Sequence, residues 1–327
     1  MKKKKMLKEI GVVCLLLVLI LSLIFIFRLI EEIVDWKNLS AGLSGYADSG
    51  EERVYYDGNW YTLKHSMESV LILGVDSGKT IAGADPNSSQ ADFIAVLVID
   101  KLNKSFSIVH INRDTMTDIN QLDQEGNPYG VFKAQLALAH TYGHTDNIKC
   151  RNTVAAVKNL LYGITIDHYF SLTMDAIPIL NDSIGGVTIS LTEDFPPLGE
   201  KATADSTILL RGEDALTFVR WRSDDPYNSN LERMERQRQY ISAISSQYVS
   251  ISSENTLEMM MEVSEYLVAD YTIDQLSLLF ERLQDYTFEG TVSLVGRAEK
   301  GDVYMEYYVD EAALQRTVVD LFYRLEE

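Results

Sequence analysis

The chain has few cysteines and few basic residues for its length. Only two cysteines, Cys14 and Cys150, occur in 327 residues. Cys14 lies in an apolar N-terminal run, so Cys150 has no disulfide partner in the rest of the chain and is predicted to be a packing residue. No CxxC pair and no zinc-type Cys/His spacing is present. Lysine and arginine total 29 against 48 acidic residues, a net charge of −19, which argues against a nucleic-acid-binding protein.

Common catalytic motifs are also missing. The sequence has no G-x-S-x-G nucleophile motif, no HExxH zinc motif, no internal repeat and no low-complexity segment. Residues 74–80 (GVDSGKT) end like a P-loop but lack its first glycine. His140 and His144 are four residues apart without a clear third metal ligand, so a packing or capping role is favoured over a metal pair.

One long apolar run is present, at residues 10–30. About 20 apolar residues are needed to cross a ~30 Å hydrocarbon core as a helix. A cleaved signal peptide would have a shorter run followed by a small-residue cleavage site, which is absent here. We therefore predict a retained transmembrane helix. The lysines at residues 2–5 and Lys8 place residues 1–9 in the cytoplasm, which predicts a single-pass protein of the cell membrane with its main domain outside.

Residues 31–69 are predicted to form an extracellular stalk, and residues 70–327 the main domain. The Gly/Ser-rich residues 40–50 would break any helix in the stalk. In residues 53–63 (RVYYDGNWYTL), an Asp-Gly pair lies between β-prone flanks. This pattern predicts a small hairpin.

The main domain alternates between strand and helix patterns. Continuous apolar runs predict buried strands, and residues 101–104 are a short connection that predicts an antiparallel hairpin between the second and third strands. The alternation indicates an α/β class with a central sheet. Strands are predicted at residues 70–75, 93–99, 106–111, 168–172, 187–191 and 291–295, and helices at 132–142, 152–162, 175–184, 212–221, 231–251, 257–268, 273–284 and 311–325.

Acidic residues and arginines gather where the predicted strands end, at Asp76, Asp92, Arg113 and Asp114. Sites in layered α/β domains form at such ends. Carboxylates there can hold Mg²⁺ while the phosphates of a ligand complete its coordination shell. A domain outside the cell has no ATP supply, so its phosphate donor would be a lipid-linked phosphate or pyrophosphate in the membrane.

A second group of cations lies in residues 218–237 (FVRWRSDDPYNSNLERMERQ), which contain Arg220, Arg222, Arg233 and Arg236. Guanidinium groups bind phosphate oxygens in a planar, bidentate manner. The alternative is a solvated helix with i, i+3 and i, i+4 ion pairs. Helical spacing places Arg233 and Arg236 beside the apolar stripe of residues 231–251. Arg220 and Arg222 can face one site only if the preceding helix ends near Trp221.

These motifs, in this order behind one N-terminal anchor, resemble those of the LytR-CpsA-Psr family. The similar segments are residues 71–77 (LILGVDS), 91–93 (ADF), 111–115 (INRDT), 133–140 (KAQLALAH), 166–169 (IDHY), 184–187 (IGGV), 215–222 (ALTFVRWR) and 233–237 (RMERQ).

The resemblance implies a three-layer α/β/α domain with a central mixed sheet and a hydrophobic tunnel for a polyprenyl tail. It implies a membrane-anchored phosphotransferase that moves a phospho-glycopolymer from undecaprenyl pyrophosphate to a sugar hydroxyl of peptidoglycan, assisted by Mg²⁺ or Mn²⁺. The glycopolymer would be teichoic acid, capsule or another secondary wall polymer.

Site residues follow from the same resemblance. Asp76 and Asp92 would bind the metal, and Asp114 would orient Arg113 or act as a base. The implied catalytic residues are Arg113, Asp114, Arg220 and Arg222, and the implied pyrophosphate-binding residues are Arg113, Arg220, Arg222, Arg233, Arg236 and Gln237.

The chain departs from the family pattern at four positions: Gln90 replaces an arginine, Asn112 a proline, Asn230 an acidic residue and Glu232 a glycine. The loop at residues 224–230 is also longer than in the family pattern. These departures keep two alternatives open: a non-catalytic polyprenyl-phosphate binder that regulates the cell envelope, and a pyrophosphatase that acts on the same lipid.

Overall fold

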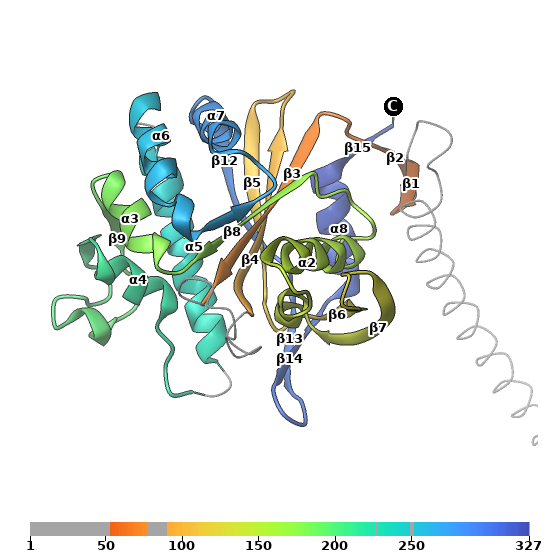
Figure 1. Cartoon of the computed structure of the whole chain (residues 1–327), viewed down its shortest axis with the longest axis horizontal. Coiled ribbons are helices and arrows are strands. Elements are labelled where there is room, and N and C mark those ends of the chain that lie inside the picture. Colours follow the sequence, from red (N-terminus) through yellow and green to blue (C-terminus); the bar gives the residue numbers. More distant parts are fainter. Residues whose placement is uncertain (1–52, 77–89, 226–227, 249–251, 327) are drawn as a thin grey trace, which may run out of the picture. The chain divides into compact units, whose positions relative to one another are not determined.

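The computed structural model describes residues 53–76, 90–225, 228–248 and 252–326 (Figure 1). The predicted transmembrane helix at residues 10–30 lies outside this part of the chain, as do residues 1–9, predicted to be cytoplasmic, and the start of the predicted stalk. Among the described helices, none combines the length and the hydrophobicity that a membrane span requires. The chain divides into two compact units, one made of Met1–Leu63 with Tyr323–Glu327 and the other of Lys64–Phe322.

The smaller unit contains a three-stranded sheet. Strands β1 (Arg53–Tyr56) and β2 (Asn59–Leu63) form an antiparallel hairpin. Its two turn residues, Asp57 and Gly58, both have positive φ, as a type I′ hairpin turn requires. The hairpin predicted from the Asp-Gly pair is therefore confirmed. Strand β15 (Tyr323–Leu325) pairs with the other edge of β2, so the last helix does not continue to residue 325 as predicted.

The larger unit is built on a six-stranded sheet with the order β11-β8-β3-β4-β5-β12. Neighbouring strands β3, β4 and β5 are antiparallel, whereas β8 runs parallel to β3 and β12 parallel to β5. The sheet is therefore mixed. Its strands are β3 (Met67–Val75), β4 (Ala91–Asp100), β5 (Ser105–Ile111), β8 (His168–Thr173), β11 (Leu267–Ala269) and β12 (Thr287–Ser293).

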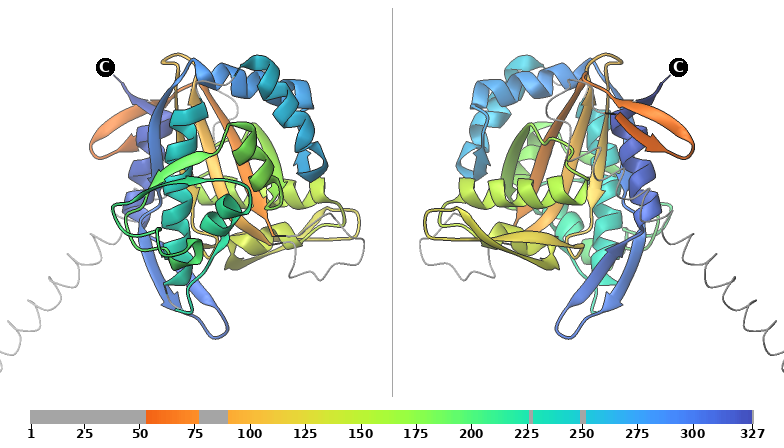
Figure 2. Two further views of the ribbon diagram at one scale, coloured as in Figure 1. Left: turned by 90° about the vertical axis from the view of Figure 1, so that its left-hand side faces the viewer. Right: turned by 90° about the vertical axis from the view of Figure 1, so that its right-hand side faces the viewer.

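Helices cover both faces of this sheet (Figures 1 and 2). One face carries α3 (Ala176–Ser183), α6 (Ser253–Glu262) and α7 (Ile273–Gln284), and the other carries α2 (Asp146–Leu160) and α8 (Glu311–Phe322). Leucines and methionines of α6 and α7 pack against β3, β4 and β5 in one buried cluster. The predicted α/β class with a central mixed sheet is thus confirmed.

Two predicted helices are wrong in part because strands form there. Residues 132–142 form the end of β7 (Pro128–Gln135) and a short 3-10 helix, η2 (Leu136–Thr141). Residues 132–135 form a strand rather than a helix because β7 pairs along its length with β6 (Met116–Leu122). Strand β6 was not predicted from the sequence. Residues 267 and 268, predicted as the end of a helix, belong instead to β11 (Leu267–Ala269), which pairs with β8 at the edge of the sheet.

Two further antiparallel strand pairs, made of short or polar strands, were not predicted from the sequence. Strand β9 (Val187–Ser190) was predicted, but its partner β10 (Thr207–Leu210) was not. Strands β13 (Gly296–Lys300) and β14 (Met305–Val309) form an antiparallel hairpin. All residues of β13 are exposed, so the strand has no hydrophobic pattern to mark it.

Candidate functional site

A β-bulge at the end of the central strands presents the first functional side chain. In the β3–β4 ladder Gly74 lies opposite Phe93 and Val75 opposite Ala91, so Asp92 is an extra residue on β4. A bulge turns a side chain away from the regular alternation of the strand. Asp76 directly follows β3. The two carboxylates predicted as metal ligands therefore lie at the same edge of the sheet.

Both carboxylates line a polar cavity of about 1020 Å³. Its walls come from the ends of β3, β4 and β5, from the segment between α4 (Glu213–Arg220) and α5 (Ser229–Tyr248), and from the β13–β14 hairpin. The structure brings seven of the predicted site residues to this one cavity: Asp76, Asp92, Arg113, Asp114, Arg220, Arg222 and Arg233.

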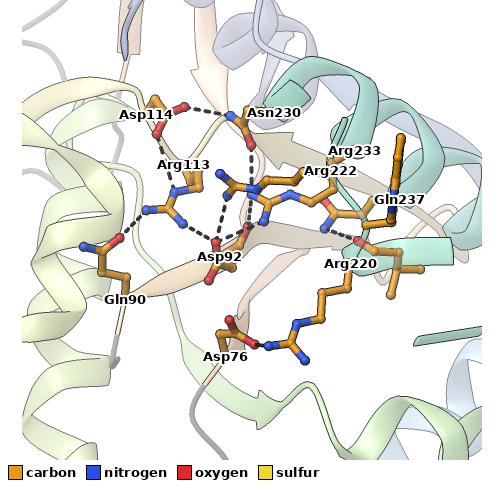
Figure 3. Close-up of polar contacts among 12 residues, drawn as sticks. Asp76, Gln90, Asp92, Arg113, Asp114, Arg220, Arg222, Asn230, Arg233 and Gln237 are labelled. Atoms are coloured by element: carbon orange, nitrogen blue, oxygen red, sulfur yellow. Dashed lines mark hydrogen bonds and ion pairs between the residues drawn. The ribbon is translucent and has the colours of Figure 1, made fainter. Parts of the chain in front are cut away.

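Three arginines converge on Asp92 (Figure 3). Its Oδ1 atom accepts hydrogen bonds from Arg222 Nη2 at 3.2 Å, from Arg233 Nη1 at 3.1 Å, and from Arg113 Nη1. Arg113 also donates to Gln90 Oε1. Burial alone would raise the pKa of Asp92, but the attraction of the three arginines outweighs it and holds this pKa below its usual value.

The arginines around Asp92 outnumber the carboxylates that they contact. Arg233 is buried, with 3% of its surface exposed. Burial and the repulsion of Arg222 lower its pKa to about 10, so it stays protonated at neutral pH. Three guanidinium groups therefore share Asp92, with Asp114 as the one other carboxylate beside Arg113. This inner group attracts a ligand with several phosphate oxygens.

Asp114 lies at the other side of Arg113, in a network of neutral donors. Its Oδ1 accepts from Gln135 Nε2 at 3.1 Å, and its Oδ2 accepts from Asn230 Nδ2 at 2.8 Å. Arg113 Nε lies 3.5 Å from Oδ1. Burial raises the pKa of Asp114 above its usual value, and the attraction of Arg113 and Arg222 offsets only part of this effect. A carboxylate that holds a proton more readily than usual suits acid–base chemistry.

Helix α4 ends at Arg220, and Trp221 is extended, with φ −56° and ψ 144°. This is the condition under which Arg220 and Arg222 can face one site, and both line the polar cavity. Arg220 Nη2 contacts Asp76 Oδ1 at 2.5 Å, in a pair that is about half exposed. The outer part of the cavity is therefore open to solvent, as is Arg222, whereas Asp92, Arg113 and Arg233 are largely enclosed.

Arg236 and Gln237 are buried but do not line the polar cavity. Arg236 donates to the carbonyls of Phe218 and Trp221, and Gln237 donates to that of Val219. These carbonyls belong to the last turn of α4, where carbonyls lack helical partners. The geometry thus gives both residues a role in fixing the end of α4, rather than the direct contact with pyrophosphate that the resemblance implied.

Two site residues escaped the sequence analysis as functional candidates. Asn230 Nδ2 donates to Asn112 Oδ1 and Asp114 Oδ2, while its Oδ1 accepts from Arg233 at 2.8 Å. Gln135 Nε2 donates to Asp114 and to the Met305 carbonyl at 2.7 Å. Asn230 was noted only as a departure from the family pattern. Gln135 lies in the segment 133–140 that resembles the family, but the sequence analysis gave it no role and predicted a helix where β7 ends.

An apolar cavity of about 510 Å³ lies beside the polar one. Met174 lines both, and α5 lines both as well, with Arg233 in the polar cavity and Tyr240, Ile241 and Ile244 in the apolar one. Apart from Thr173, Gln237 and two serines, the walls of the apolar cavity are aliphatic or aromatic. The adjoining cavities fit a ligand with an anionic head and a hydrocarbon tail.

The residues present fit a divalent cation whose coordination shell is completed by the phosphate oxygens of a ligand. Mg²⁺ is commonly held by one or two carboxylates together with substrate phosphates, and Asp76 and Asp92 supply two carboxylates on one cavity wall. Within the described part of the chain, no group of three or more His, Cys, Asp or Glu could hold a metal by itself. A cation would compete with Arg220 and with the three arginines for these carboxylates.

The chain is similar in sequence and in fold to proteins that are already known. The polyisoprenyl-teichoic acid–peptidoglycan teichoic acid transferase TagU of Enterococcus faecalis is 28% identical over 264 residues, which cover 77% of this chain and 78% of that protein. TagU of Bacillus subtilis is 25% identical over 303 residues, 89% of each chain. The crystal structure of B. subtilis TagV has the same fold, with a TM-score of 0.61 and 21% identity over 79% of this chain and 98% of TagV.

The sequence model of the LytR_cpsA_psr family matches residues 44–320. This span contains every site residue described above and most of the chain. The chain belongs to the LytR_cpsA_psr family.

Proposed function

We propose that the chain transfers a phospho-glycopolymer from polyprenyl pyrophosphate to a sugar hydroxyl of peptidoglycan. One observation carries the proposal: an arginine-lined polar cavity adjoins an apolar cavity, with Met174 and α5 common to both. A pyrophosphate would occupy the first cavity and the polyprenyl chain the second. The names of the TagU relatives, which give teichoic acid and peptidoglycan as substrates, support the same class of reaction.

The inner arginines would bind and activate the donor. With the donor bound in the polar cavity, Arg113, Arg222 and Arg233 would face the position where negative charge increases as the phosphoryl group is transferred. Preorganised cations at such a position lower the barrier. They are already fixed by Asp92 and Gln90, so little reorganisation is needed when the donor binds.

Asp114 would act as the base. The acceptor hydroxyl oxygen forms a bond to the phosphorus that carries the polymer, and its proton passes to Asp114. The bond from that phosphorus to the bridging oxygen breaks, and polyprenyl phosphate leaves. Asn230 and Gln135 hold the two oxygens of Asp114 in place for this step.

A Mg²⁺ or Mn²⁺ ion would be held by Asp76 and Asp92 together with phosphate oxygens. It would supply additional neutralisation of phosphate charge. Residues 10–30 would anchor the chain in the membrane that supplies the lipid donor, with the main domain outside the cell.

The test is a transfer reaction. The full chain in detergent is incubated with a polyprenyl-pyrophosphate-linked glycopolymer, Mg²⁺ and peptidoglycan, and polymer covalently bound to the glycan is measured. Attached polymer together with released polyprenyl phosphate is the expected result. A folded chain that releases polymer phosphate into solution without attachment would instead be a pyrophosphatase, and one that binds the lipid without turnover would be a non-catalytic binder.

A further inference from the structure

The β13–β14 hairpin is an exposed element that the proposed reaction has not yet used. Residues 301–304 form its tip, closed by a hydrogen bond from Gly301 N to the Tyr304 carbonyl at 2.9 Å. At the tip, Val303 is 75% exposed and Tyr304 is 66% exposed. Figures 1 and 2 show the hairpin, in blue, projecting beyond the end of the central sheet. Large apolar side chains at such an exposed tip are available to a ligand.

The base of the hairpin is fixed to the turn between β5 and β6, which carries Asp114. Tyr307 N donates to the Asp114 carbonyl at 2.9 Å, and Tyr307 Oη donates to the Leu294 carbonyl at 2.9 Å. Gln135 Nε2 donates both to the Met305 carbonyl and to Asp114 Oδ1. The hairpin is therefore held at a defined position beside the proposed base.

The hairpin also forms one wall of the polar cavity, through Ala298 and residues 300–307. The volume of this cavity, about 1020 Å³, is that of a site for a complete small molecule. Two phosphate groups at the arginines leave most of it unfilled. The remaining wall offers one exposed tyrosine ring, Lys300 and Asp302.

The direction of the reaction indicates which molecule fills this space. In phosphoryl transfer the attacking and leaving oxygens are roughly in line. The leaving polyprenyl phosphate lies on the side of Met174, because that residue joins the polar and apolar cavities. In Figure 3 Asp76 and Asp114 lie at opposite ends of the polar group, with Asp92 between them. The acceptor hydroxyl must therefore approach from the side of Asp114, where the hairpin stands.

We propose that the hairpin tip, residues 301–304, binds the sugar rings of the acceptor glycan, with Tyr304 packed against a ring face and Lys300 and Asp302 paired with its hydroxyl and amide groups. Tyrosine combines an apolar ring with a polar end, which suits the apolar C–H face and polar rim of a sugar. This inference rests on the proposed transferase function. It assigns the acceptor, rather than the polymer of the donor, to the hairpin.

The test separates acceptor from donor recognition. With the full chain in detergent, KM is measured for soluble β-1,4-linked peptidoglycan glycan strands and, separately, for the lipid-linked donor. Tyr304→Ala is expected to raise the acceptor KM about five- to tenfold, the scale of one lost aromatic contact, with the donor KM and the unfolding temperature unchanged. Tyr304→Phe keeps the ring that packs on the sugar, so its acceptor KM should stay much closer to that of the wild type than that of Tyr304→Ala does. Tyr129→Ala is the matched control, since Tyr129 is 70% exposed and lies outside the polar cavity.

Two outcomes of the kinetic test overturn the proposal: an unchanged acceptor KM in Tyr304→Ala, or a rise in the donor KM alone, which would assign the hairpin to the donor polymer. Binding of the same glycan strands is also measured by calorimetry without donor. This measurement tests the hairpin site even if the chain transfers no polymer. A wild-type chain that transfers nothing but binds the strands through Tyr304 refutes the proposed function and supports the hairpin site. A chain that transfers normally and binds equally well without Tyr304 refutes the hairpin site alone.

Discussion

Arg113 connects two partly buried carboxylates of the polar cavity, Asp92 and Asp114. It donates to Asp92, and its Nε lies 3.5 Å from Asp114. Its charge lowers the pKa of both carboxylates, whereas burial raises both. Asp92 has further arginines beside it and stays ionised, while burial prevails at Asp114. Two aspartates at one site thus differ in proton affinity because of how many guanidinium groups each one contacts.

Replacement of Arg113 by alanine should lower the transfer rate about 10²- to 10³-fold, because a single preorganised electrostatic donor often contributes that much. The rate is measured with saturating donor and acceptor. Arg238→Ala is the matched control, since Arg238 lies on α5, donates to Glu235 and Ser293, and does not line the cavity. A rate within threefold of the wild type in Arg113→Ala would contradict the role given to this residue.

The transfer rate should rise with pH through the raised pKa of Asp114, because only the ionised carboxylate can accept the proton of the hydroxyl. This rise should lie above the ordinary aspartate pKa of about 4 and be absent in Asp114→Asn. A pH–rate profile of kcat/KM measures it, with Asp118→Asn on the exposed side of β6 as the control. A rise that persists in Asp114→Asn would assign the base to another group.

The shifted pKa values of Asp114 and Asp92 make the stability of the fold depend on pH in opposite directions. The pKa of Asp114 is raised in the folded state, so its contribution to the free energy of unfolding is full below the unfolded pKa and is lost as pH increases through the folded pKa. The pKa of Asp92 is lowered, so its contribution is present above the unfolded pKa and is lost as pH falls through the folded pKa.

Among the elements, the end of β3 separates the two cavities. Gly74 lines the apolar cavity, and Asp76, two residues later, lines the polar one. A Cβ atom on Gly74 would lie 2.9 Å from Phe93 Cβ and 3.1 Å from Met174 Cε. Glycine is therefore required at this point so that Phe93 and Met174 can pack closely over the strand.

Gly74→Ala should displace Met174 or the strand, with a loss of about 1–3 kcal/mol in the free energy of unfolding and weaker binding of polyprenyl pyrophosphate. Denaturant unfolding and lipid binding are the measurements. Gly130→Ala on β7 is the comparison, because its nearest neighbour is the flexible side chain of Gln121. Unchanged stability and unchanged lipid affinity in Gly74→Ala would show that Phe93 and Met174 can accommodate a Cβ atom at residue 74 without a cost.

The elements that the sequence predicted well are those whose pattern is local. The apolar runs of β3, β4 and β5 and the helix α7 appear within a few residues of their predicted ends. The elements that were missed depend on partners elsewhere in the chain. Strand β7 exists because β6 pairs with it, and β15 because β2 does. The exposed strand β13 has no apolar pattern, so the hairpin and its contacts with Asp114 could not be anticipated.

In the site, too, residues with a local signal were predicted and residues that depend on distant partners were not. The motifs located the arginines and aspartates of the polar cavity because guanidinium and carboxylate groups identify their chemistry by themselves. Gln135 and Asn230 are ordinary amides, and only their hydrogen bonds to Asp114 give them a function. Arg236 and Gln237 resemble ligands in sequence, but their contacts are with the carbonyls that end α4.

For the whole molecule, binding of the complete donor should stabilise the fold more than binding of its head alone. Polyprenyl pyrophosphate would fill both cavities and inorganic pyrophosphate only the polar one. A ligand at 100 times its Kd adds about 2.7 kcal/mol to the free energy of unfolding, which thermal unfolding detects. The control is a polyprenol without phosphate. Equal shifts for pyrophosphate and polyprenyl pyrophosphate at equal concentration would argue against lipid in the apolar cavity.

Removal of residues 1–30 should release the chain from the membrane fraction of expressing cells, because this segment carries the apolar run of the sequence. Fractionation followed by detection of the chain measures it. A variant with residues 2–5 changed from lysine to serine should stay in the membrane fraction, since hydrophobicity rather than charge drives insertion. A truncated chain that remains membrane-bound would place the anchor elsewhere.

The amide of Gln135, with one nitrogen on Asp114 and on the Met305 carbonyl, has a consequence for fidelity. If the hairpin tip binds the acceptor glycan as proposed, the glycan would also act on the hydrogen bond that orients Asp114, whereas a water molecule is too small to contact the hairpin tip and the phosphorus at once. Proton transfer would then depend on the arrival of the sugar acceptor. Such coupling would protect the bound donor from hydrolysis, and replacement of Gln135 would remove that protection.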